Sequence, residues 1–173
     1  MTENREFIKD KLKIISSYLI TAIGGILLAL FIITHVVSLA TIVGTSMLPT
    51  LDSGDIVILN KLPQEYKRFD IIVIDVADEL IVKRVIGTPG DTVHIRNGRV
   101  YINEEELEDV INEHIEFSGL ATSRVRLGEG EYFVLGDNRS NSKDSRYPEI
   151  GTIKEAQIIG QVVFSVIPFR TIK

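Results

Sequence analysis

The stretch LIVKRVIGTPGDTVHIRNGRVYIN, residues 80–103, shows most clearly the sequence pattern that most of this chain follows. It contains three short runs rich in β-branched residues, separated by Gly, Pro, Asp and Asn, a pattern typical of β-strands joined by turns. Asn97 and Gly98, between the second and third runs, both tolerate the positive φ angles of a type I′ turn, so a tight β-hairpin is predicted there. The three predicted strands are residues 81–86, 92–96 and 99–103.

The same pattern continues on both sides of this stretch, and helical periodicity is nearly absent from residue 42 onward. Residues 104–116 are rich in acidic side chains and poor in large apolar ones, so they are predicted to form a solvated surface segment. The predicted fold class is mainly β, with an all-β domain of antiparallel sheets in residues 37–173. Its further predicted strands are residues 41–43, 56–60, 71–75, 132–135 and 158–166.

An uncharged segment precedes this domain. No charged side chain occurs between Lys13 and Asp52, and residues 14–33 are almost wholly apolar. A helix needs about 20 apolar residues to cross the core of a bilayer, so residues 14–36 are predicted to be a transmembrane anchor helix. A cleaved signal peptide is the alternative, because residues 38–40 (SLA) resemble a cleavage site. The apolar region of a signal peptide, however, runs for only about 7 to 15 residues.

The distribution of basic residues predicts how this anchor is oriented. Basic residues favour the cytoplasmic side of a membrane, and the first one after the apolar segment is Lys61. The chain is therefore predicted to be a single-pass protein of the cell membrane, with residues 1–13 in the cytoplasm and residues 37–173 on the outer side. The basic residues before the segment are Arg5, Lys9, Lys11 and Lys13.

Composition excludes several classes of function. The 173 residues leave room for one globular domain plus an anchor. A formal net charge of -5 argues against a protein that binds nucleic acid, because such proteins need a positive surface to displace counterions from phosphates. The absence of cysteine excludes disulfides, thiolate catalysis and cysteine-based metal sites.

Ser46 is a candidate nucleophile. It lies in residues 43–51, VGTSMLPTL, directly after a predicted strand, where Gly44 and Pro49 favour a bend that can present a side chain. A serine in such a bend is more often simply a turn residue. A serine hydroxyl also attacks a carbonyl only when an adjacent base accepts its proton.

Lys83 is the candidate base. Lysine can act as a base when desolvation lowers its pKa from about 10.4. On a strand, Ile81 and Val85 share the face of Lys83, which makes it the lysine that burial affects most. The alternative is an edge-strand lysine that guards against aggregation. Histidine is a common base, but none of the three histidines has a setting that suggests an orienting carboxylate: His35, His94 and His114.

A third polar cluster follows the predicted strand 132–135. Residues 136–146 read GDNRSNSKDSR, and so many hydroxyl, amide and charged groups could form a buried network. A solvated loop and a calcium loop are the alternatives. Calcium is disfavoured because Arg139 and Lys143 occupy alternate positions where a calcium loop needs oxygen ligands, so no metal site is predicted.

Together, and in this order after an N-terminal anchor, the three motifs resemble those of bacterial type I signal peptidases, peptidase family S26, in the compact single-span form of Gram-positive bacteria. The endoplasmic-reticulum type of the family has histidine at the position of Lys83, so the resemblance is to the bacterial type. The motifs are residues 44–51 (GTSMLPTL), 83–91 (KRVIGTPGD) and 136–146.

The resemblance implies a role for each matched residue. Ser46 would be the nucleophile and Lys83 the general base, with the Ser46 backbone N–H in the oxyanion hole. The Ser142 hydroxyl would orient the lysine amine, while Met47 and Leu48 are expected to contact the substrate. The polar framework around the site would consist of Arg84, Asp137, Asp144 and Arg146.

Two positions depart from the family pattern. Gly44 stands where many members carry a serine that donates a second hydrogen bond to the oxyanion. Loss of one such donor can cost about 10²-fold or more in rate, so a backbone group or water is expected to substitute. Thr88 replaces a leucine that is common in the family, and this change is expected to be tolerated.

The activity that the resemblance implies is removal of N-terminal signal peptides by a serine endopeptidase, through acyl transfer and without a metal or cofactor. Family substrates carry small residues, typically alanine, at the first and third positions before the cut, and bind as an extended strand. Expected partners are signal-peptide-bearing preproteins, the lipid bilayer and the protein translocation machinery. Because residues 38–40 resemble such a cleavage site, cleavage of the chain by itself after Ala40 is a further hypothesis.

Two other functions fit part of the pattern. Self-cleaving repressors of the SOS response share a related Ser/Lys catalytic domain, but they are cytosolic, and the predicted anchor argues against them. A non-catalytic, membrane-tethered β-domain that acts in surface protein assembly would be expected to have lost Ser46 or Lys83. This chain retains both residues.

Overall fold

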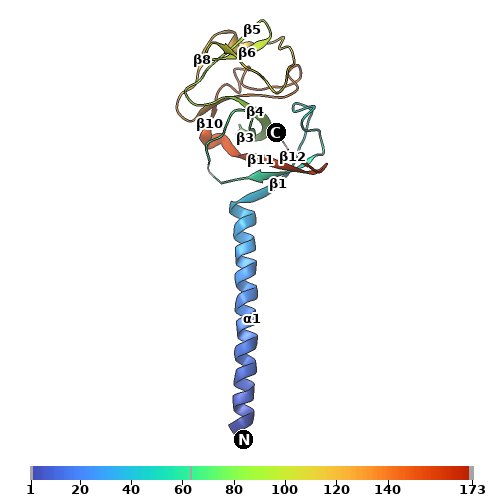
Figure 1. Ribbon diagram of the computed structural model, residues 1–173, viewed down its shortest axis with the longest axis vertical. Coiled ribbons are helices and arrows are strands. Elements are labelled where there is room, and N and C mark those ends of the chain that lie inside the picture. The colour runs from blue at the N-terminus through green and yellow to red at the C-terminus, as the bar shows by residue number, and fades with distance from the viewer. Residues whose placement is uncertain (1, 63, 172–173) are drawn as a thin grey trace. The chain divides into compact units, whose positions relative to one another are not determined.

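The computed structural model describes residues 2–62 and 64–171, and the chain divides into a unit that ends at Val37 and a unit that begins at Ser38. The first unit contains one continuous helix, α1 (Thr2–His35), drawn in blue in Figure 1. Its part Lys11–His35 is apolar and has 25 residues, which at about 1.5 Å each extend beyond the roughly 30 Å of a bilayer core. The large apolar side chains of this part are exposed, so a lipid environment would cover them.

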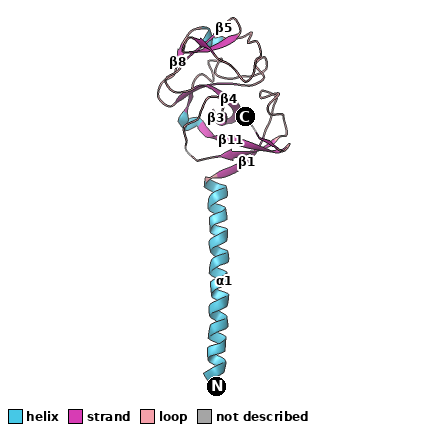
Figure 2. Ribbon diagram, viewed as in Figure 1, coloured by secondary structure: helices cyan, strands magenta, loops and turns pink. Residues whose placement is uncertain are grey.

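The second unit is built from antiparallel strands (Figure 2), which confirms the predicted mainly β fold class. Within the described residues, the larger sheet has the strand order β1-β2-β11-β3-β4-β9-β10, with β12 paired to β11, and the smaller sheet has the order β7-β6-β5-β8. Two 3-10 helices, η1 (Gly119–Thr122) and η2 (Glu155–Gln157), lie between strands. The strands are β1 (Val37–Thr41), β2 (Ile56–Asn60), β3 (Ile71–Val76), β4 (Glu79–Gly87), β5 (Thr92–Arg96), β6 (Arg99–Ile102), β7 (Glu105–Glu106), β8 (Val125–Arg126), β9 (Glu131–Leu135), β10 (Ile153–Lys154), β11 (Ile158–Ile167) and β12 (Arg170–Thr171).

Strand β3 lies in the interior of the larger sheet, and both of its faces are buried. Ile71 and Val73 belong to one hydrophobic cluster, whereas Ile72 and Ile74 belong to another. Successive side chains of a strand point to opposite faces, so this continuous apolar run suits a strand that is covered on both sides. The register of β3 with β4 places Lys83 opposite Ile72, beside this buried interior.

The predicted hairpin at Asn97-Gly98 is confirmed. Strands β5 and β6 pair in a register that sets Arg96 opposite Arg99, which leaves a loop of the two residues between them. Asn97 has φ 50° and Gly98 has φ 72°, as a type I′ turn requires. Gly98 is also required sterically, because a Cβ atom there would lie 2.0 Å from the ring of His114.

The strand predicted for residues 41–43 is wrong, because β1 ends at Thr41. Ile42 instead exchanges backbone hydrogen bonds with Gly54 and Asp55, in the turn before β2. Gly44 then has φ 90°, which turns the chain out of the extended conformation. The segment after β1 is therefore a bend, and this bend carries Ser46.

Candidate active site

Ser46 and Lys83 lie side by side in the second unit. The Lys83 Nζ donates one hydrogen bond to the Ser46 Oγ at 2.9 Å and another to the backbone carbonyl of Val82 at 2.9 Å. Ser46 comes from the bend after β1 and Lys83 from β4, so the fold brings together residues that are 37 positions apart. An amine and a hydroxyl at this separation can exchange a proton directly.

The surroundings of Lys83 favour its neutral form. Only 3% of its surface is exposed. Burial penalises the charged ammonium and lowers the pKa of Lys83 to about 8, with Asp144 and Asp137 opposing this shift and Arg146 adding to it. At a pKa of about 8, roughly one amine in ten is neutral at pH 7, and the neutral amine is the form that can accept a proton.

The bend that carries Ser46 is held from two sides. Met47 and Leu51 are buried in the core, and the backbone N–H of Leu51 donates to the carbonyl of Met47 at 2.9 Å. Asn138 donates its backbone N–H to the Ser46 carbonyl and its side-chain amide to the Thr45 carbonyl, both at 3.0 Å. The third sequence motif therefore positions the first.

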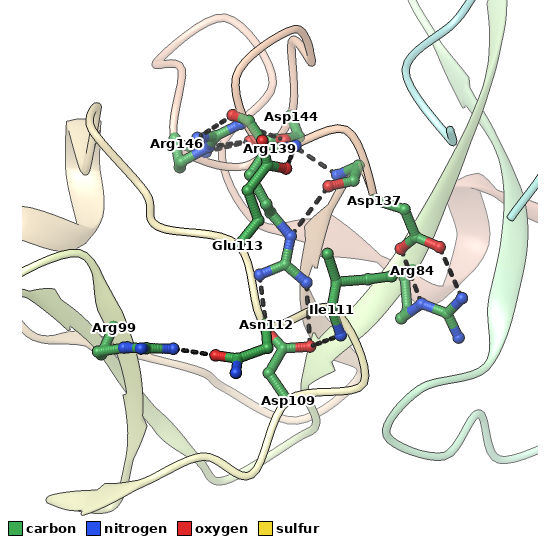
Figure 3. Close-up of polar contacts among 11 residues, drawn as sticks. Arg84, Arg99, Asp109, Ile111, Asn112, Glu113, Asp137, Arg139, Asp144 and Arg146 are labelled. Atoms are coloured by element: carbon green, nitrogen blue, oxygen red, sulfur yellow. Dashed lines mark hydrogen bonds and ion pairs between the residues drawn. The ribbon is translucent and has the colours of Figure 1, made fainter. Parts of the chain in front are cut away.

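Two buried ion pairs support this arrangement (Figure 3). The Arg84 guanidinium on β4 donates to both carboxylate oxygens of Asp137, at 2.8 and 2.6 Å. The Arg146 guanidinium donates to both oxygens of Asp144, at 2.8 and 2.9 Å, and Asp144 also accepts the backbone N–H of Gly136 at 3.0 Å. All four charged side chains are almost fully buried, and each charge is compensated by its partner.

Ser142 is buried close to Ser46, but the structure does not bring it into hydrogen-bond contact with Lys83. Its Oγ makes no hydrogen bond to any described residue. A Cβ atom on Gly136 would lie 2.1 Å from the Ser142 Oγ and 2.5 Å from the Ser46 carbonyl oxygen. Only glycine at position 136 allows these two groups to approach each other so closely.

A cleft of about 240 Å³ opens beside Ser46 and Lys83. Gly44 lines it, and the space where a Cβ atom on Gly44 would point is open. Met47 lines the cleft as well, whereas Leu48 lines a separate groove. The remaining walls are largely apolar and comprise Ala40, Thr41, Ile42, Val43, Val73, Leu80, Ile81 and Val82.

The acidic segment, residues 104–116, is largely exposed, as predicted, but two of its carboxylates also take part in this region. Asp109 accepts two hydrogen bonds from the buried Arg139 guanidinium, at 2.6 and 3.1 Å, as Figure 3 shows. Glu113 accepts the backbone N–H of Arg139 at 3.0 Å. Arg139 lies inside the third motif, but no pattern in the sequence marks carboxylates 26 and 30 positions away as its partners.

Comparison with known proteins identifies the family. The family model described as "Signal peptidase, peptidase S26" matches residues 15–167. Signal peptidase I of Bacillus caldolyticus is 38% identical over 143 residues, which cover 73% of this chain and 78% of that protein. Signal peptidase I of Bacillus licheniformis is 36% identical over 162 residues, covering 86% of this chain and 87% of that protein.

A solved structure is also similar to this chain. It is the crystal structure of a signal peptidase I from Enterococcus faecalis, which is 34% identical and aligns with a TM-score of 0.47, covering 57% of this chain and 97% of that chain. The family model and the Bacillus relatives confirm the resemblance that the three motifs indicate. The chain belongs to the S26 family of signal peptidases.

Proposed function

We propose that this chain is a membrane-bound serine endopeptidase that removes N-terminal signal peptides from exported preproteins. One observation carries the proposal: a buried lysine amine donates a hydrogen bond to a serine hydroxyl at the wall of an apolar cleft. Membership of the signal peptidase family supplies the class of substrate.

The proposed mechanism is acyl transfer. The neutral Lys83 amine accepts the proton of the Ser46 hydroxyl, and the oxygen attacks the scissile carbonyl while the Ser46 backbone N–H donates to the developing oxyanion. The carbon–nitrogen bond then breaks, and the leaving amine takes the proton from Lys83. Water then gives a proton to Lys83 and attacks the carbonyl of the resulting ester. The bond from this carbon to the Ser46 oxygen breaks, the oxygen takes the proton back from Lys83, and the signal peptide leaves. These steps need only the serine, the lysine and water.

The cleft accounts for the expected preference for small residues before the cut. The cleft has a volume of about 240 Å³, and its largely apolar walls include Ala40, Ile42 and Val82. An extended chain places alternate side chains on the same side, so the first and third residues before the scissile bond would point into such a cleft together. Small apolar substrate side chains fit into the cleft, and they bring no polar group that would lack a hydrogen-bond partner there.

Ser142 is assigned as the third hydrogen-bond partner of the Lys83 ammonium. An ammonium group has three N–H donors, and Lys83 uses two of them, toward Ser46 and Val82. The buried and unpaired Ser142 Oγ could accept the third after proton transfer. The ion pairs Arg84–Asp137 and Asp144–Arg146 are assigned as the framework that keeps these groups in place.

The proposed location is the cell membrane, with residues 1–13 in the cytoplasm and the β unit on the outer side, as the basic residues before the apolar part of α1 imply. In this orientation the helix would hold the site near the membrane surface, where cleavage sites of preproteins emerge. Preproteins and the lipid bilayer are then partners of the chain, and the protein translocation machinery is proposed as a third.

The test is cleavage of a preprotein in detergent by the wild type and by two variants, Ser46→Ala and Lys83→Ala. The kcat/KM of each variant should fall at least about 10³-fold. Ser46→Ala removes the nucleophile, and Lys83→Ala removes the base that activates it. A variant at the exposed Lys143 should keep wild-type activity. Wild-type turnover in both dyad variants would refute the proposal.

A further inference from the structure

A second groove adjoins the bend that carries Ser46. It has a volume of about 600 Å³ and shares no lining residue with the cleft beside Ser46 and Lys83. Leu48 and Pro49 form its wall on the side of the bend, only two and three residues after Ser46, and Asn138 lines it as well. The opposite wall is residues 110–113 of the acidic segment.

The wall formed by residues 110–113 is fixed at both ends. Arg139 holds Asp109 through its guanidinium and Glu113 through its backbone N–H. Asp109 also accepts the backbone N–H of Ile111 at 3.0 Å, which closes a tight turn. On the outer side, Arg99 donates to the side chain of Asn112, a contact visible in Figure 3.

Between these fixed points the wall presents apolar side chains to solvent. Val110 is 51% exposed although both of its neighbours are anchored, and Ile111 is half-buried. Leu48 lies on the other wall. Because the segment is anchored at both ends, the exposure of these apolar side chains is a fixed feature of the surface. Such side chains lining a groove are suited to contact a bound peptide.

The position of the groove identifies its occupant. A peptide whose scissile carbonyl lies at the Ser46 Oγ continues in two directions, and the apolar cleft beside Lys83 can hold only one of them. Asn138 joins the two regions, since it lines the groove and donates its backbone N–H to the Ser46 carbonyl. The chain leaving Ser46 away from the cleft therefore runs past Leu48 and Asn138.

We propose that this groove binds the residues that follow the scissile bond, so that the enzyme reads the start of the mature protein as well as the signal peptide. The assignment rests on the proposed function. The groove's volume of about 600 Å³ leaves room for a short stretch of extended chain. Leu48, Val110 and Ile111 on its walls favour apolar side chains in that stretch.

Two substrates separate this role from catalysis. Both carry the same signal-peptide residues before the cut. The long one continues for several residues with an apolar side chain at the second position, and the short one ends in a chromogenic leaving group. The measured quantity is the ratio of kcat/KM for the long substrate to that for the short one.

Val110→Asp should lower this ratio about tenfold, because it replaces an apolar contact with a charge. Leu120→Asp is the matched control, since Leu120 is similarly exposed, at 41%, and lines no part of the groove, and it should leave the ratio unchanged. Val110→Ala, a change that preserves folding, should lower the ratio about threefold. Circular dichroism verifies that each variant is folded.

An unchanged ratio in both Val110 variants would overturn the groove assignment, and so would an equal fall in the Leu120 control. In either case a wild type that cuts both substrates leaves the proposed function standing. A wild type that cuts neither substrate would refute the proposed function, and the groove assignment with it. The two failures are therefore distinguishable.

Discussion

At the scale of single residues, the burial of Lys83 should make activity depend on pH. The pKa of Lys83 is lowered to about 8, and in the proposed mechanism the neutral amine is the form that acts as a base. The value of kcat/KM should therefore rise about tenfold per pH unit below pH 8 and level off above it, because it reports ionisation of the free enzyme. A profile that is flat between pH 6 and pH 9 would contradict this role.

The matched variant is Lys83→His, measured over the same pH range. Imidazole has an unperturbed pKa of about 6.5, so whatever activity this variant retains should level off at lower pH than the wild type. If the rise stayed near pH 8 in the variant, a group other than residue 83 would be responsible for it.

The sequence pointed to the two residues proposed to react, whereas it did not predict their hydrogen bonds. Ser46 stands in a bend and Lys83 in an apolar strand, and both signals are local. The hydrogen bond of Lys83 to Ser46 and the missing contact with Ser142 depend on how the bend after β1, strand β4 and the loop after β9 pack together. Thr88 likewise makes contacts that its sequence context does not indicate, because its backbone N–H and its hydroxyl both donate to Asp91 at 2.8 Å.

At the scale of elements, the Arg84–Asp137 pair joins strand β4 to the loop after β9. Removing one member of a buried pair leaves an uncompensated charge, so Asp137→Ala should lower the free energy of unfolding by about 3 to 5 kcal/mol. Chemical denaturation in detergent, followed by tyrosine fluorescence, measures the loss. The exposed pair Arg124–Glu104 is the control, and Arg124→Ala should leave the denaturation midpoint nearly unchanged.

A denaturation midpoint of Asp137→Ala equal to that of the wild type would show that the pair does not stabilise the fold. An effect on activity alone would then place Asp137 in the reaction itself rather than in the framework.

The elements that local sequence specifies were predicted well. The β5–β6 hairpin follows from Asn97-Gly98, and β2 and β5 begin and end where their apolar runs do. The two-residue strands β7, β8, β10 and β12 were missed. Strands β8 and β10 exist only through pairing with β5 and β9, which are distant in sequence. Strands β7 and β12 pair with the neighbouring β6 and β11 but are too short to show an alternating pattern. Distance in sequence also explains the acidic segment, because Asp109 and its partner Arg139 are 30 positions apart.

At the scale of the whole molecule, α1 and the β unit have separate stabilising contacts. Each hydrophobic cluster of the described chain consists of residues from Ala40 onward, so the β unit does not need the helix for its core. A chain that begins at Ser38 should therefore fold and keep the Ser46–Lys83 pair. It should cleave a soluble peptide at a rate within about threefold of the full chain in detergent, because the cleft and the dyad are intact.

The same truncated chain should be at least about tenfold slower than the full chain on a preprotein embedded in vesicles. Confinement to one surface raises the effective concentration of enzyme and substrate, and this advantage disappears with the helix. Truncated Ser46→Ala serves as the control for contaminating proteases. Equal rates of the full and truncated chains on the embedded preprotein would mean that the β unit binds the membrane by itself, so that α1 would not be what brings Ser46 to its substrate.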